Sequence, residues 1–425
     1  MKPMTSSEHR ALTSSRPGAG LTRLLRCRLQ RRLQGLRGGR LVIEDELGQA
    51  TLGTGQTQLR LTVRDLAFYR LLATQGSVGA GEAYAKGLWH CDDLVGLVRL
   101  LVHNRDQLDG MEKGPARLAA WALKLWHAGR RNTRAGSRRN IAAHYDLGNA
   151  FFACFLSPDL MYSSALWDGS RDTLQAASRR KLETICRKLE LSSSDHVIEI
   201  GGGWGGFAIH AARHHGCRVT TATLSREQHT LASARVREAG LQDRVTVVLK
   251  DYRDLQGQYD KLVSIEMIEA IGAPFLETYF AKVAGLLHDR GRALIQAITI
   301  EDHRYAQALA SVDFIKRHIF PGSFIPSIEA MLRAKTRACD LALVHQEDFG
   351  MSYARTLQAW REGFLAHLPD IRAQGYDDEF CRLWEFYLAY CEGGFRERSI
   401  GVSHLLFARP NARPTDGRWL RETRP

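Results

Sequence analysis

The sequence lacks the cysteine patterns that mark disulfide-rich and zinc-binding proteins. Its eight cysteines are scattered over 425 residues, no two form a CxxC pair, and none lies in a His-rich cluster with zinc-ligand spacing. We therefore expect neither a disulfide framework nor a metal site. Reduced thiols in a cytoplasm fit this pattern better.

Long apolar runs are also missing. No stretch of about 18 apolar residues occurs, so the sequence predicts no membrane-spanning helix. The Arg-rich N-terminus has no apolar core of the kind that secretory signals carry. No sustained period of glycine, proline or heptads is present, which excludes collagen and coiled-coil chains. We expect a cytoplasmic protein whose membrane contact is peripheral, at the inner membrane face.

Acidic residues are too few to balance the basic ones. The chain has 59 Lys+Arg against 46 Asp+Glu, a formal net charge of +13. This excess favours a polyanionic partner, which would be nucleic acid, an anionic membrane surface or an acidic ligand. The alternative is a well-solvated, Arg-rich surface without a partner.

The pattern along the chain predicts four parts. Residues 1–20 are polar and resemble a disordered tail, and 21–110 predict a small mixed α+β domain that opens with a basic amphipathic helix. Residues 111–140 form a basic linker, which is either solvated or docked on phosphate head groups. Residues 141–410 predict the catalytic domain, with helical lid insertions at about 301–398.

Strand and helix patterns alternate in this last part. Repeated βα units of this spacing require an α/β fold with a parallel sheet and helices on both faces. The predicted strands are 196–200, 217–224, 244–249, 259–267, 291–300 and 402–409. The main predicted helices are 205–215, 226–239, 275–288, 353–368 and 377–398.

A glycine-rich turn follows the first of these strands. Glu199, Gly201, Gly203 and Gly205 make an ExGxGxG pattern, which is neither the dinucleotide GxGxxG nor a P-loop. Glycines let the backbone approach a ligand closely, and the following helix presents free N–H groups. An acidic residue before the turn suits a ligand with a positive amino group, such as S-adenosylmethionine (SAM).

Two further strand ends support a SAM site. The second strand ends in Thr223 and Leu224, with Gln228 close behind, and lacks the acidic residue of a dinucleotide site. After the third strand, Asp251 can accept the adenine amino group and Tyr252 can flank the ring. The turn alone would also fit a structural role. The three features in this order predict SAM binding.

Several stretches resemble the cyclopropane fatty acid synthases. The resemblance spans about 60–409 and implies a class I methyltransferase fold with a doubly wound, mostly parallel seven-stranded sheet. It also implies transfer of the methyl carbon of SAM to a cis double bond of an unsaturated phospholipid, and a homodimer formed through the N-terminal domain. The matching stretches include HYDLGNAFF, LMYSSALW, IEIGGGWGGFA, HIFPGSFIPS and YLAYCEGGFRERSI.

The resemblance implies a bicarbonate held by a Cys, a Glu, a His, a Tyr and a backbone group. At those positions this sequence has Ser164, Glu269, Gln296 and His318, so most of the bicarbonate ligands are replaced. A strand that usually ends in Gly ends here in Glu266. We hypothesise that Glu266 supplies the carboxylate that bicarbonate supplies elsewhere. The alternative is a hydrogen-bond acceptor or ion-pair partner at the SAM site.

Other candidate residues also come from the resemblance. Cys391 falls at the family's active-site cysteine, although a cysteine on an apolar helix face is more often packing. Tyr162 and Ser163 resemble the segment that folds over the methionine end of the cofactor. His144 is either a capping residue or a contact at the SAM and lipid entrance. The aromatic stretch 314–326 is either an acyl tunnel or plain core.

Different functions remain open at this stage. In the reaction that the resemblance implies, methyl transfer to the double bond leaves a carbocation in the acyl chain. A different quenching of this carbocation would give a methyl-branched or methylene fatty acid. A nucleic-acid methyltransferase would fit the arginines, but residues 266–269 read EMIE where an Asn/Asp-Pro-Pro-aromatic motif is expected. A non-enzymatic lipid-binding protein would not need the SAM signature.

Overall fold

A computed structural model describes residues 19–108, 147–169 and 171–412 of the chain. The basic linker at 111–140, His144 and almost all of the N-terminal tail lie outside these residues. Among the described helices, none has the length and apolar character needed to cross a membrane.

The N-terminal part contains a four-stranded sheet with the order β2-β1-β3-β4. The strands β1 and β3 pair in parallel, and inward-facing apolar residues alternate along β3. The helix α2 is broken into two halves at Gly76 (φ 56°, ψ −130°). The elements are α1 (Ala19–Leu33), β1 (Arg40–Asp45), β2 (Gly48–Leu52), β3 (Gln58–Val63), α2 (Ala67–Ala85), β4 (Trp89–Cys91), α3 (Leu94–His103) and α4 (Arg105–Leu108).

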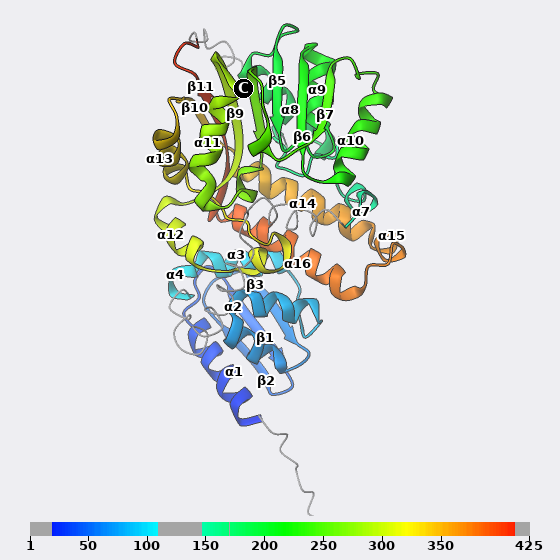
Figure 1. Ribbon diagram of the computed structural model, residues 1–425. Coiled ribbons are helices and arrows are strands. Elements are labelled where there is room, and N and C mark those ends of the chain that lie inside the picture. The colour runs from blue at the N-terminus through cyan, green and yellow to red at the C-terminus, as the bar shows by residue number, and fades with distance from the viewer. Residues whose placement is uncertain (1–18, 109–146, 170, 413–425) are drawn as a thin grey trace, which may run out of the picture.

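The larger part contains the predicted seven-stranded sheet, with the order β10-β11-β9-β8-β5-β6-β7 (Figure 1). The five strands β5 to β9 are parallel, and β11 is antiparallel to both of its neighbours. This is the doubly wound, mostly parallel α/β sheet expected from the sequence. The strands are β5 (His196–Ile200), β6 (Arg218–Thr223), β7 (Val245–Leu249), β8 (Tyr259–Ile265), β9 (Leu287–Ile300), β10 (Ala342–Asp348) and β11 (Ile400–Ala408).

Helices cover both faces of this sheet because alternate strand residues point to opposite sides. On β5, Val197 packs with the helices α8 and α9, whereas Ile198 packs with α11 and α13. The carboxyl ends of β5, β6, β7 and β8 therefore open on one edge between these layers. The helices are α7 (Asn149–Ala153), α8 (Leu174–Leu189), α9 (Gly206–His215), α10 (Arg226–Glu238), α11 (Leu276–Gly285) and α13 (Ile328–Ala338).

The segment expected as a helical lid is not helical throughout. Its residues 342–348 form β10, an edge strand of the main sheet with a bulge between Leu343 and His345. Exposed and half-buried residues alternate along β10, so it lacks the apolar run that marked the central strands. Its sequence pattern therefore does not mark it as a strand.

The remaining helices lie between the two sheets (Figure 1). The helix α16 packs against α14, α3 and α2, so it joins both parts of the molecule. Small residues allow this close approach: a Cβ added at Gly393 would lie 2.5 Å from Val98 Cγ1 on α3. These elements are α12 (Asp302–Ala310), a π-helical turn η5 (Ile315–Ile319), α14 (Gly350–Ala366), α15 (Leu368–Ala373) and α16 (Asp378–Arg396).

Candidate active site

The glycine turn connects β5 to α9 at the carboxyl edge of the sheet. Gly201, Gly203 and Gly205 have φ values of 86°, 52° and 81°, which side-chain-bearing residues rarely adopt. A Cβ at Gly203 would meet nothing within 4 Å, so this glycine borders open space. A Cβ at Gly202 would lie 1.7 Å from Thr221 Oγ1 on β6, so position 202 has no room for a side chain.

Glu199 lies below the turn as a buried carboxylate. It is 1% exposed, and its Oε2 accepts a 2.6 Å hydrogen bond from Thr221 Oγ1. Burial raises the Glu199 pKa to about 7, although the Thr221 hydrogen bond and the charge of Lys181 oppose this. A cationic amino group would favour the ionised form, as the sequence analysis expected for the methionine end of SAM.

Lys181 on α8 is a buried cation that the sequence analysis missed. It is fully buried, and its Nζ donates a 2.7 Å hydrogen bond to Ser163 Oγ. Burial lowers the Lys181 pKa to about 8, and the carboxylates of Asp159, Glu266 and Glu199 act against this shift. Lys181 therefore donates to Ser163 and at the same time attracts the carboxylates of Asp159, Glu266 and Glu199.

The ends of β6 and β7 place the other predicted cofactor residues. Thr223 Oγ1 donates to Gln228 Oε1 at 2.7 Å, and Leu224 lies in the turn that leads to α10. Asp251 is 2% exposed, and both of its carboxylate oxygens accept from the Arg253 guanidinium. Asp251 thus has an ion-pair partner on its own loop, and its contact with adenine stays a prediction.

Tyr252 follows Asp251 and packs edge-on against Tyr279. Its hydroxyl is buried and has no hydrogen-bond partner within the described ranges. Burial raises the Tyr252 pKa to about 12, so the phenol remains neutral. An apolar ring with an unused hydroxyl at the end of β7 suits a residue that flanks a nucleobase.

Glu266 lies directly after β8 and receives three hydrogen bonds. Ser164 N–H donates to Oε1 at 2.9 Å, Gln296 Nε2 donates to Oε1 at 2.7 Å, and the Tyr353 hydroxyl donates to Oε2 at 2.7 Å. Its φ of 49° is in the left-handed region that favours glycine. Burial raises the Glu266 pKa, while the three donors favour the carboxylate and act in the other direction.

Glu269 is a second buried carboxyl group near Glu266. Its Oε1 accepts the Ile298 N–H at 2.6 Å, whereas Oε2 is buried and finds no hydrogen-bond partner among the described residues. Burial and the nearby Glu266 charge raise the Glu269 pKa to about 8. Three donors oppose the effect of burial at Glu266, whereas a single N–H donates to Glu269, so Glu266 is the better stabilised carboxylate of the pair.

A hydrogen-bonded chain extends from Glu266 through the sheet. Gln296 Oε1 lies 2.9 Å from His404 Nε2, and His404 Nδ1 lies 3.0 Å from Lys188 Nζ. Because Gln296 uses its amide N–H on Glu266, its oxygen must accept, so His404 donates from Nε2 and accepts at Nδ1 from Lys188. Lys188 in turn pairs with the half-exposed Glu347. The chain fixes the orientation of the Gln296 amide toward Glu266.

Aromatic side chains border the same region. The Tyr162 ring lies 5.2 Å from Trp360 and 6.4 Å from Phe320 between ring centroids, and its hydroxyl is 2.9 Å from that of Tyr387. The Tyr353 ring stacks on Phe395 at 4.4 Å. Trp360 also lies 6.1 Å from the Tyr353 ring between centroids, so aromatic side chains gather beside the tyrosine that donates to Glu266.

His318 Nε2 lies 3.2 Å from Glu82 Oε1 on α2, and its ring packs against Phe314. The phenol that donates to Glu266 belongs to Tyr353 on α14. A role of His318 in catalysis stays a prediction. Cys391 is half-buried on α16, and burial and the Asp313 charge raise its thiol pKa. It is therefore a neutral thiol and not a nucleophile.

Tyr353, Lys181 and His404 carried no signal in the sequence. Tyr353 is 87 positions from Glu266 and His404 is 108 positions from Gln296, and no motif links them. The packing of α14 on β11, and the pairing of β11 with β9, bring these pairs together.

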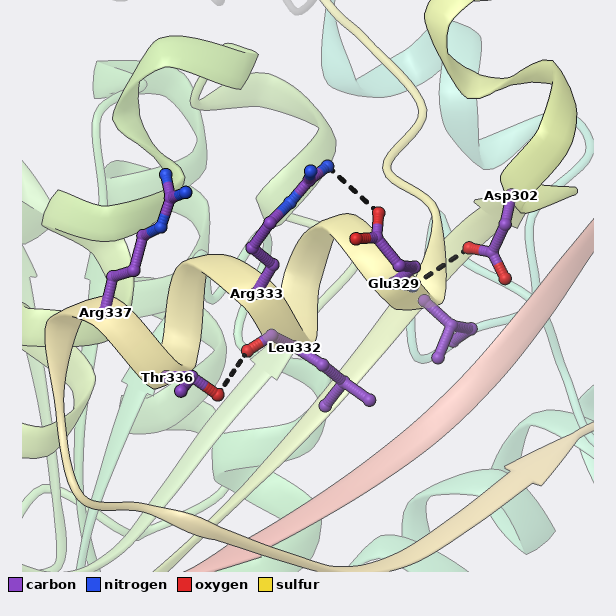
Figure 2. A pocket seen from close by; sticks show the side chains of 7 residues that line it. Asp302, Glu329, Leu332, Arg333, Thr336 and Arg337 are labelled. Atoms are coloured by element: carbon purple, nitrogen blue, oxygen red, sulfur yellow. Dashed lines mark hydrogen bonds and ion pairs between the residues drawn. The ribbon is translucent and has the colours of Figure 1, made fainter.

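A separate surface hollow of about 550 Å³ lies between α12 and α13 and is lined by none of the residues above (Figure 2). Its charged groups are already paired, with Arg333 on Glu329 at 3.0 Å and the Glu329 N–H on Asp302 at 2.9 Å. Figure 2 shows these contacts along one exposed side of α13. The hollow is not part of the candidate active site.

The glycine turn, the buried Glu199 and the polar ends of β6 and β7 all lie at the carboxyl edge of one parallel sheet. Strand order and site together define a class I SAM-dependent methyltransferase. The family model described as mycolic acid cyclopropane synthetase matches residues 132–405. The chain belongs to this family, and it is a SAM-dependent C-methyltransferase.

Relatives and solved structures support this assignment. The chain is 37% identical to a tuberculostearic acid methyltransferase of Mycobacterium tuberculosis over 347 residues, which are 79% of this chain and 80% of the relative. It is 35% identical to the cyclopropane-fatty-acyl-phospholipid synthase of Escherichia coli over 365 residues, 85% of this chain and 90% of the relative. A cyclopropane synthase structure from Mycobacterium tuberculosis matches with a TM-score of 0.60 and 27% identity, covering 64% of this chain and 98% of that one. The complex of a mycolic acid cyclopropane synthase with SAH and CTAB matches with the same TM-score and 26% identity, again covering 64% and 98%.

Proposed function

We propose that this enzyme transfers the methyl carbon of SAM to the cis double bond of an unsaturated phospholipid acyl chain and forms a cyclopropane ring. The observation that carries the proposal is the Glu266 carboxylate, held by Ser164, Gln296 and Tyr353 beside the SAM cradle. The 35% identity to a cyclopropane-fatty-acyl-phospholipid synthase over most of both chains supports the phospholipid substrate.

When bound, SAM supplies an electrophilic methyl group, which the alkene π electrons attack to leave a carbocation in the acyl chain. Ring closure then requires one proton to leave the transferred carbon, and its C–H electron pair becomes the third ring bond. Glu266 accepts this proton as a general base. The neutral Glu269 adds no second negative charge beside it, so Glu266 is the proton acceptor of the pair.

The surrounding residues protect the cation. The rings of Tyr162, Trp360 and Phe320 exclude water, which would otherwise quench the carbocation to an alcohol. Aromatic faces also attract positive charge, by about 0.5–2 kcal/mol for each well-placed ring. Bicarbonate is not needed in this scheme, because the protein itself supplies the carboxylate.

A test of the whole proposal uses labelled SAM and unsaturated phospholipid vesicles, with NMR of the extracted lipid. Cyclopropane methylene signals are the expected result. The similarity to a tuberculostearic acid methyltransferase favours a second candidate, a methylene or methyl-branched chain. Ring and methylene isomers have equal mass, so NMR and not mass spectrometry separates them. Unlabelled lipid under conditions where SAM is bound would contradict both.

The role of Glu266 has its own test in Glu266→Gly. Because φ at this position is 49°, glycine removes the carboxylate and relieves backbone strain at once. We expect turnover without bicarbonate to fall by about 10²–10⁴-fold, the usual contribution of a general base, and to recover partly with added bicarbonate. The wild type should be insensitive to bicarbonate. Strict dependence of the wild type on bicarbonate would overturn the role of Glu266.

A further inference from the structure

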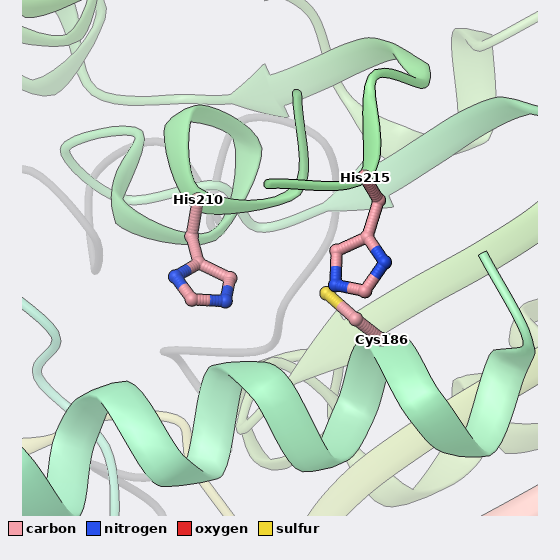
Figure 3. A group of neighbouring side chains, drawn as sticks. All are labelled: Cys186, His210 and His215. Carbon is pink, nitrogen blue, oxygen red and sulfur yellow. The ribbon is translucent and has the colours of Figure 1, made fainter. Parts of the chain in front are cut away.

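Three side chains with metal-binding atoms converge between α8 and α9, the two helices that cover the Val197 face of the sheet. The sulfur of Cys186 and one ring nitrogen each of His210 and His215 all lie within 4.8 Å of one another. Figure 3 shows Cys186 projecting from α8 toward the two imidazoles, which come from the α9 segment. Cysteine and histidine are the ligands that Zn²⁺ prefers.

Glu183, one turn before Cys186 on α8, contacts both imidazoles of this group. Its Oε2 lies 3.3 Å from His210 Nε2 and 3.1 Å from His215 Nε2. Zinc binds nitrogen and oxygen ligands at about 2.0–2.2 Å, so two such donors on a tetrahedral ion stand roughly 3.3–3.6 Å apart. The Glu183 oxygen and both imidazoles already have close to this spacing without an ion.

We propose that Cys186, His210, His215 and Glu183 bind one zinc ion. A thiolate and a carboxylate balance the two positive charges, and the imidazoles bind as neutral ligands, so the proposed centre is neutral overall. The thiol gives up its proton to solvent when it binds the metal. The side chain of Cys186 is buried, whereas Glu183 is 40% exposed and leaves an entry route for the ion.

The proposed site is structural. Four protein ligands close the coordination sphere and leave no position for a substrate. The ion would tie α8, which carries Lys181, to α9, which begins at the glycine turn. The sequence predicted no metal site because the ligands come as two pairs, 183/186 and 210/215, from two helices. Only their packing forms one group.

The experiment uses untagged full-length protein that has been stripped of metal with a chelator. Co²⁺ is added first as a spectroscopic probe, and Zn²⁺ affinity is then measured in competition with a chromophoric chelator. We expect one ion per chain, the thiolate-to-cobalt charge-transfer band, the visible bands of a tetrahedral ion, and a higher Tm with Zn²⁺.

Variants identify the ligands. Cys186→Ser should abolish the charge-transfer band, and His215→Ala should weaken Zn²⁺ binding by at least about tenfold. His214→Ala is the matched control, because His214 is exposed and its ring lies 4.6 Å from that of His210, outside the proposed ligand group. It should bind like the wild type.

Circular dichroism of each variant in chelator shows whether it folds. If Cys186→Ser does not fold, the test rests on His215→Ala, because His215 is partly exposed and its replacement disturbs the core less. Weak binding of several ions, no charge-transfer band in folded wild type, or equal affinity of His215→Ala and wild type would overturn the proposal.

Discussion

At the residue scale, the site depends on two glutamates whose environments differ. Glu266 receives three hydrogen bonds on its carboxylate, whereas Glu269 receives one backbone N–H and has a buried, unpartnered Oε2 as far as the described residues extend. Donors favour the ionised form, and burial favours the neutral form. Glu266 is therefore the better stabilised carboxylate of the two.

Tyr353→Phe tests how the Glu266 pKa is held. Losing the hydroxyl removes a donor that favours the carboxylate, so the Glu266 pKa should rise and the acidic limb of the kcat/KM profile should move to higher pH. A charge-assisted hydrogen bond is worth about 1.5–3 kcal/mol, which is roughly one to two pH units. Tyr390→Phe, another buried tyrosine whose ring packs on Phe386 and Phe314, should leave the profile unchanged. An unmoved limb in Tyr353→Phe would contradict the assignment.

Glu269→Gln tests how much the ionisation of the buried Glu269 carboxyl group lowers the stability of the folded protein. The folded-state pKa is raised from about 4.5 to about 8, so its stabilising effect is complete below pH 4.5 and is lost as pH rises through 8. The variant keeps an acceptor for Ile298 N–H but cannot ionise. We expect a higher Tm than the wild type at pH 8.5 and an equal Tm at pH 4.5. An equal Tm difference at both pH values would show that Glu269 does not titrate in this range.

At the element scale, α16 holds the two sheets together through close packing. Its Gly393 meets Val98 on α3, and Gly81 on α2 lies where a Cβ would come 2.3 Å from the Phe314 ring. Larger residues at these contacts would push α2 and α3 away from the helices that border the site. Gly393 in YLAYCEGGF is therefore needed for this packing.

Gly393→Ala measures this packing. Overfilling a packed interface costs about 1–3 kcal/mol, so the variant should melt at a lower temperature in differential scanning calorimetry. Gly285→Ala on α11 is the control, because its Cβ would meet nothing within 4 Å. That change should be neutral or stabilising by about 0.4–1 kcal/mol. Equal effects of the two substitutions would refute the packing argument.

At the scale of the whole molecule, the net charge of +13 predicts attraction to an anionic bilayer. Cosedimentation should therefore be strong with vesicles of anionic phospholipid, weak with zwitterionic ones, and should fall steeply between low and physiological salt. Equal binding to zwitterionic vesicles, or preferential binding to DNA in a mobility-shift assay, would contradict a peripheral membrane enzyme. Analytical ultracentrifugation tests the expected homodimer.

Much of the fold was predictable because its signals are local. The strand 196–200 was predicted at the observed residues because its short apolar run ends in glycines. The helix that starts at 226 was also predicted at its observed start, where Ser225 caps it. The seven-stranded sheet, the SAM-dependent chemistry and the family are confirmed. The three-residue β4 and the half-exposed β10 were missed, because neither has an apolar run of its own.

The glycine turn, the order of βα units and the positions of Glu266 and Glu269 could be predicted, because each depends on residues that are close in the chain. Three contacts could be found only in the folded molecule: Tyr353 donates to Glu266, His404 orients Gln296, and Cys186 lies beside His210 and His215. These contacts join residues that are 24 to 108 positions apart. They form because helices and strands must pack their apolar faces together, and that packing brings the polar residues of distant segments to the same place.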